Sequence, residues 1–237
     1  MKHQSFALVV VGAILFAPAC RSQEYPEMRF SRVFGVEGNW NRAEDVLFGR
    51  VVNVLQVGTQ QIANPPQPLP DTVHEIYWCQ ADFRAAAAVK GSLPAPGKKV
   101  LWAVIRPDCS AYLDWDLDTG ANQPPVTRVW FLREEGEYLR PVSDGGLFSV
   151  SFNWKWVDVP KAEAPRLFAS LLLDPASRGF PPERYSEAIL DASEVARSIL
   201  PKEELVARLK TLSLSPVPRA REDICGYLAA AFQEPCK

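Results

Sequence analysis

The sequence predicts an α+β fold, in which a small antiparallel β-barrel or sandwich is followed by a bundle of about four short helices. Residues 44–158 carry short runs of β-branched and aromatic side chains separated by turn residues, which is typical of such barrels. All seven Trp lie between Trp40 and Trp156. From residue 159 onward, Ala and Leu recur at helical spacing and indicate antiparallel helices.

The predicted strands share β-branched residues or an alternation of apolar and polar side chains. They cover residues 46–57, 74–90, 99–105, 126–132, 138–142 and 147–157. Residues 85–88 are four Ala, which favour helix and are unusual inside a strand. Residues 133–137 form a short charged connection with Gly136 placed for a positive φ, so we expect a hairpin there.

The predicted helices cover residues 163–173 and 185–199, a segment that begins at Pro201, and residues 218–232. Pro201 and Pro218 fall near helix starts, where the missing N–H of proline costs nothing. The expected organisation is a signal peptide at 1–19, a polar tether at 20–43, a barrel at 44–158 and a helical domain at 159–237.

Three aromatic side chains, Phe152, Trp154 and Trp156, share one face of the last predicted strand. Only a few residues separate this strand from the first helix, so we expect the helices to dock on that aromatic face. Trp154 and Trp156 are also candidates for a stacking platform that binds a glycan or a peptide.

The N-terminus predicts export. A basic start precedes an apolar run at residues 6–17, which is too short to remain as a membrane span. Ala17-Pro18-Ala19 fits a signal-peptidase site, and Cys20 follows directly. Cleavage after Ala19 releases a secreted protein, whereas lipidation of Cys20, in a motif that resembles a degenerate bacterial lipobox, anchors the chain to the cell envelope.

Four cysteines remain once Cys20 is set aside as the lipid acceptor, and four cysteines allow three pairings. Their placement favours Cys79 with Cys109 and Cys225 with Cys236, as structural disulfides of an oxidising compartment. On the chain-entropy model the longer loop contributes about 3.5 kcal/mol and the shorter one somewhat less than about 3 kcal/mol. No CxxC or HxxxH spacing that would suggest zinc occurs.

Residues 44–143 resemble the netrin-like module shared with tissue inhibitors of metalloproteinases. The resemblance rests on "DVLFGRVVNV" from Asp45, on the turn Lys90-Gly91, on Cys109 and on "VWFLREEGEYLRPV". It implies a five-stranded barrel of OB type. The family's N-terminal Cys-x-Cys is absent, because Arg21 and Ser22 follow Cys20. The C-terminal stretch "SPVPRAREDICGYLAAAF" is faintly similar to one helix pair of a HEAT-type repeat.

Candidate chemistry is sparse. The sequence LDWDLDTG places Asp114, Asp116 and Asp118 at alternate positions, which suits either a weak calcium site or the outward face of a strand. Without the signal segment, His74 is the one histidine left for acid–base catalysis. Nothing in the sequence predicts a cofactor.

The composition is globular, with 47% hydrophobic and 23% charged residues, and excludes a disordered chain and a multi-pass membrane protein. A net charge of −2 disfavours nucleic acid as a partner. The sequence favours an extracytoplasmic binding or scaffold protein, secreted or lipid-anchored, that contacts an envelope protein or a glycan. The alternative is a cell-envelope hydrolase with carboxylates in the barrel cleft, from Asp114, Asp116 or Asp118, or with a partnered His74.

Overall fold

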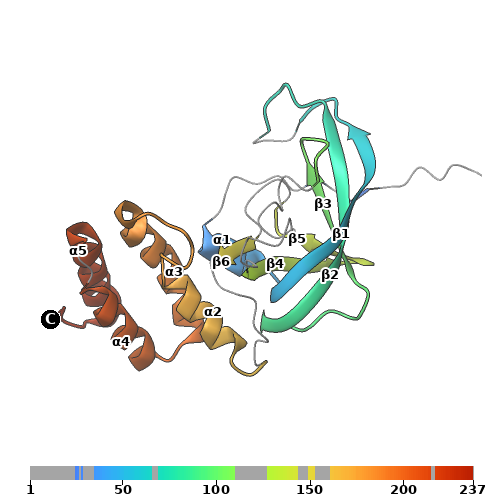
Figure 1. The fold of residues 1–237 in the computed structure, drawn as a ribbon. Coiled ribbons are helices and arrows are strands. Elements are labelled where there is room, and N and C mark those ends of the chain that lie inside the picture. The colour runs from blue at the N-terminus through green and yellow to red at the C-terminus, as the bar shows by residue number, and fades with distance from the viewer. Residues whose placement is uncertain are drawn as a thin grey trace, which may run out of the picture.

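The structure is a computed structural model that describes residues 25–26, 28, 35–65, 69–109, 127–143, 149–152, 161–214 and 217–236. A β-barrel in the first half is followed by helices in the second, as Figure 1 shows. The predicted α+β fold class is confirmed. Among the described helices, none has the length and apolar character that a membrane crossing requires.

The strands are β1 (Asp45–Gln61), β2 (Glu75–Lys90), β3 (Lys99–Val104), β4 (Thr127–Glu135), β5 (Tyr138–Pro141) and β6 (Ser149–Phe152). The sheet order is β1-β2-β3-β5-β4-β6, and a further pairing of β1 with β4 closes the first five strands into a barrel. All pairs are antiparallel except β3 with β5. This closed, five-stranded barrel is of OB type.

Two features of the strands bear on the expectations from the sequence: the turn between β4 and β5, and the run of Ala in β2. Gly136 turns between β4 and β5 with φ 59°, as expected for the predicted hairpin. The four Ala at 85–88 remain strand because they pair with β1, where Phe48 faces Ala87. Tertiary pairing therefore overrides their helical propensity.

The barrel interior is a continuous apolar core. Trp102 and Trp130 are fully buried in it, together with Leu47 and Leu139. The disulfide between Cys79 and Cys109 joins β2 to the segment after β3, with the two Cα atoms 5.7 Å apart. This pairing, and that of Cys225 with Cys236, are as predicted.

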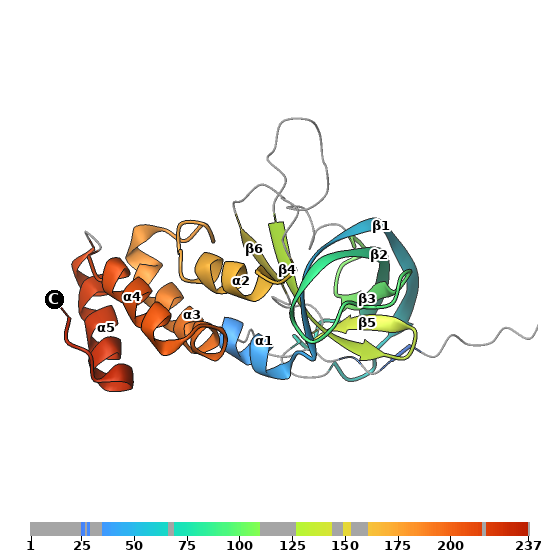
Figure 2. The same cartoon turned by 90° about the horizontal axis from the view of Figure 1, so that it is seen from below.

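The helices are α1 (Val36–Arg42), α2 (Ala164–Leu172), α3 (Tyr185–Ile199), α4 (Lys202–Leu212) and α5 (Pro218–Tyr227). A 3-10 turn, η1 (Pro182–Arg184), precedes α3, and α5 continues as a π turn, η2 (Leu228–Phe232). Figure 2 shows α1 and α2 next to the barrel and α4 and α5 at the far end of the molecule.

Helix α1 lies inside the segment that we expected to be a polar tether, so that expectation is wrong for Val36–Arg42. A long-range contact fixes the helix: the N–H of Val36 donates to Oδ2 of Asp191 in α3 at 3.0 Å. Gly35 permits this approach, because a Cβ there would lie 2.2 Å from Oδ1 of Asp191. The short segment folds because a partner distant in the sequence caps it.

Phe168 of α2 is the aromatic side chain at the centre of the contact between the helices and the barrel. Its ring centroid lies 6.1 Å from that of Trp40, 6.4 Å from that of Phe48 and 6.3 Å from that of Phe131. We call these four residues the junction cluster. They belong to one core that continues from the outer face of β1, β2 and β4 into α1, α2 and α3.

The docking surface that we expected from the sequence included Trp154 and Trp156, which lie outside the described residues. The described docking contacts run through the first part of β1, the end of β2 and the middle of β4. There, side chains alternate between the barrel interior, as for Leu47 and Trp130, and the helices, as for Phe48 and Phe131. These strands are therefore buried on both faces.

Lys90 of β2 holds the end of α1 against the barrel, and its removal should destabilise the protein. Its Nζ donates to the backbone oxygens of Trp40 at 2.8 Å and Ala43 at 2.7 Å, at the end of α1. Lys90→Met keeps most of the apolar stem and loses both bonds, so we expect the free energy of unfolding to fall by about 2 kcal/mol.

Chemical denaturation measures this change. Lys99→Met is the matched control, because Lys99 is an exposed residue of β3, and it should change the free energy of unfolding by less than about 0.5 kcal/mol. Equal effects of the two substitutions would contradict this role of Lys90.

Candidate functional site

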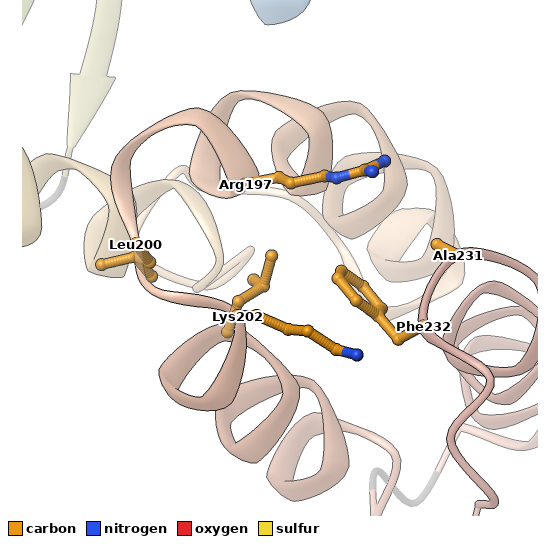
Figure 3. A pocket seen from close by; sticks show the side chains of 6 residues that line it. Arg197, Leu200, Lys202, Ala231 and Phe232 are labelled. Carbon is orange, nitrogen blue, oxygen red and sulfur yellow. The ribbon is translucent and has the colours of Figure 1, made fainter.

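A pocket of about 390 Å³ lies among α3, α4 and η2, at the end of the molecule away from the barrel. Figure 3 shows its lining. Two residues are cationic and four are apolar: Arg197, Lys202, Leu200, Leu205, Ala231 and Phe232. No carboxylate and no histidine lines it.

The corner between α3 and α4 brings the two cations together. Leu200 leaves α3 in an extended conformation with ψ 145°, and Pro201 starts α4 at once with φ −54°. The chain therefore turns within two residues. As a result, Arg197 in the last turn of α3 and Lys202 in the first turn of α4 line the same pocket.

The other wall of the pocket is fixed by the end of the chain's last helix. Gln233 adopts the left-handed conformation with φ 59° and ends η2. The N–H of Glu234 then bonds to the Leu228 oxygen at 3.2 Å, as in a helix C-cap. The disulfide between Cys225 and Cys236 closes the same turn and holds Phe232 in place.

The ring of Phe232 points into the space between the side chains of Arg197 and Lys202, as Figure 3 shows. The guanidinium carbon of Arg197 lies 5.8 Å from the ring centroid, which is a cation–π distance. Nη1 of Arg197 lies 3.8 Å from Oε2 of Glu194, and water partly screens this pair because the two side chains are 54% and 40% exposed.

Two further groups set the electrostatics near the pocket. The Lys210 ammonium, 2.7 Å from Oε2 of Glu234, lowers the pKa of Glu234, and Lys202 adds to this effect. Tyr227 donates from its hydroxyl to Oε1 of Glu194 at 2.7 Å. Burial, and then this bond, raise the pKa of Tyr227 well above its usual value.

Most residues predicted from the sequence as binding or metal sites fall outside the part of the chain that the structure describes. Cys20, Trp154 and Trp156 lie outside the described residues, as do Asp114, Asp116 and Asp118. His74 is exposed just before β2. Within the described ranges, no group of three or more His, Cys, Asp or Glu could hold a metal ion.

Sequence reasoning missed Arg197, Lys202 and Phe232. Charged residues at helix ends are usually solvated, so neither cation stands out in the sequence. Two signals could have pointed to the pocket. Pro201 lies between the cations and predicts a turn, and the cysteine pair at 225 and 236 predicts a closed end next to Phe232.

Comparison with protein-family models, with curated proteins and with solved structures gives no match for this chain. The function is therefore argued from the site itself.

The ion pair of Glu234 makes stability depend on pH. Because its folded pKa lies below the ordinary value of 4.5, ionised Glu234 stabilises the fold above about pH 4.5. That contribution is lost as the pH falls through the lowered folded pKa. We expect the stability difference between the wild type and Glu234→Gln to shrink from pH 7 to pH 3.

Denaturant unfolding at a series of pH values measures this difference. Lys210→Gln should flatten the profile in the same way as Glu234→Gln, since it removes the main cause of the shift. A difference between the wild type and Glu234→Gln that stays constant over this range would contradict the assignment.

Proposed function

We propose that this chain is an extracytoplasmic binding protein, and that its α3–α4 pocket binds an acidic, partly apolar segment of another protein of the cell envelope. The observation that carries the proposal is the placement of Arg197 and Lys202 on either side of Phe232, with no acidic residue in the lining. Such a pocket is complementary to a carboxylate that lies beside an apolar side chain.

The geometry supports a protein segment over a glycan. Sugar rings stack on exposed aromatic faces, whereas Phe232 is 8% exposed and an arginine lies over its ring. Leu200 and Leu205 form the buried apolar base of the pocket, and the partly exposed Ala231 supplies apolar surface that suits an aliphatic side chain. The volume of about 390 Å³ is at the lower end of known ligand sites and fits one or two side chains.

The same lining supports binding over hydrolysis. A hydrolase needs a nucleophile or an acid–base pair at its pocket, and this lining has neither. The exposed position of His74 favours the same reading.

The proposal includes export. The two disulfides suggest an oxidising, extracytoplasmic environment. With the signal segment at 1–19, they support export followed by release or by lipidation of Cys20. If Cys20 is lipidated, the protein fractionates with membranes and Cys20→Ser releases it. A wild-type protein found wholly in the soluble fraction would contradict the anchor.

We also retain the netrin-like relationship as a proposal for the barrel. The closed barrel of five strands and the turn at Lys90-Gly91, where Gly91 has φ 76°, support it. The α3–α4 pocket lies in the helices, and its proposed role does not depend on this relationship.

A pair of labelled peptides tests the pocket. The probe is an acetylated Leu-Glu-Leu-Glu-Leu peptide, and its control carries Gln in place of each Glu. We expect the full chain to bind the Glu peptide and to bind the Gln peptide at least about tenfold more weakly. Fluorescence anisotropy measures both, and added salt should weaken the binding.

Variants of the protein locate the effect. Arg197→Gln and Lys202→Gln should each weaken binding of the Glu peptide about tenfold. Arg219→Gln is the control, because this arginine of α5 is 85% exposed and lies outside the pocket lining. Equal affinity for the two peptides, or equal losses in all three variants, would overturn the proposal.

A further inference from the structure

A second aromatic site lies on the outer face of β2 and β3. Ile76 and Trp78 of β2 pack there with Leu101 and Ala103 of β3. These residues share no member with the core that joins the barrel to the helices, so this face belongs to another side of the barrel.

The side chain of Trp78 forms a fixed platform on this face. Its Nε1 donates to Oε1 of Gln60 at 3.0 Å. The guanidinium carbon of Arg140 lies 5.0 Å from the ring centroid, and the Arg140 side chain is 1% exposed. Gln60 of β1 and Arg140 of β5 thus contact the indole from the barrel itself.

Tyr25 occupies the platform. The ring of Tyr25 stacks on Trp78, with centroids 5.1 Å apart and an angle of 6° between the planes. The Tyr25 hydroxyl donates to the backbone oxygen of Val57 at 3.0 Å. Tyr25 itself is only half-buried, although the indole beneath it is fully covered.

Gly58 shapes the place where the phenol hydroxyl sits. A Cβ added to this glycine would lie 1.5 Å from the Tyr25 oxygen, and its three nearest atoms all belong to Tyr25. The absence of a side chain at Gly58 of β1 thus leaves the space that the tyrosine hydroxyl fills. A smaller or a purely apolar side chain would leave the Val57 oxygen without this donor.

Partly buried apolar residues surround the platform and extend the surface beyond Tyr25. Val57 belongs to β1, and three more follow β1, precede β2 or follow β3: Ile62, Val73 and Ile105. A ligand longer than a single tyrosine would gain contact with this rim.

We infer that the Trp78 face is a binding site for a tyrosine side chain, which Tyr25 fills within the chain and which a tyrosine-bearing segment of a partner protein fills when it displaces Tyr25. The exchange replaces the stacked ring and the hydrogen bond of Tyr25 with the same two contacts, and the partner also replaces the packing of Met28 on this face. Added contacts with the apolar rim then favour the partner. The site is separate from the α3–α4 pocket and does not depend on it.

Peptide binding to the full-length Tyr25→Ala variant tests the inference. The probe is a synthetic peptide of residues 22–28, which carries Tyr25. We expect it to bind Tyr25→Ala at least about tenfold more tightly than the wild type, where the site is filled. Replacing its Tyr with Phe should weaken binding about tenfold through the lost hydrogen bond, and replacing it with Ala should abolish binding.

Titration calorimetry measures these affinities, and the indole N–H signal of Trp78 reports stacking at the site. The Tyr25→Leu variant keeps an apolar side chain over the indole. It should also bind the Tyr peptide most tightly, the Phe peptide more weakly and the Ala peptide not at all. The matched control is Tyr25→Ala combined with Gly58→Ala, which should melt like Tyr25→Ala but lose the peptide. Equal peptide affinity with and without Gly58→Ala, or equal affinity for the Tyr and Ala peptides, would overturn the inference.

Discussion

The ring of Phe168 lies among Trp40, Phe48 and Phe131, so that one side chain of α2 contacts α1 and the outer faces of β1 and β4. The helices farther from the barrel stack on α2 and α1 through the same continuous core. Lys90 and Asp191 then fix the two ends of α1. The barrel and the helices therefore share their apolar interior, and neither half buries its surface alone.

This arrangement leaves two sites on different parts of the molecule. The α3–α4 pocket lies among the outermost helices, where a proline corner and a disulfide fix its walls. The Trp78 platform lies on the barrel, where Gln60 and Arg140 fix it. These are the two surfaces at which we propose that partners bind.

Much of the fold follows from the sequence, because local pattern sets it. β-branched runs predicted the strands, Gly136 predicted the hairpin, and the spacing of Ala and Leu predicted α3 from residue 185 to residue 199. Apart from the two disulfides, contacts between distant residues could not be predicted. Helix α1 depends on its hydrogen bond to Asp191, and the contact between the helices and the barrel depends on Phe168. The pocket depends on the turn between α3 and α4, which brings together the two surface cations Arg197 and Lys202. The stack of Tyr25 on Trp78 joins residues 53 positions apart.

The central claim is that the barrel and the helices unfold as one cooperative unit through the junction cluster. Native-state hydrogen exchange on the wild type and on Phe168→Ala tests it directly. We predict that the slowest amides of β2 and β4 and those of α3 report the same free energy of opening. In the Phe168→Ala variant, the free energy of opening should fall by about 3–5 kcal/mol for both the barrel amides and the helix amides. Helix amides that open at a lower free energy than the barrel, with barrel amides unchanged by the substitution, would contradict the claim.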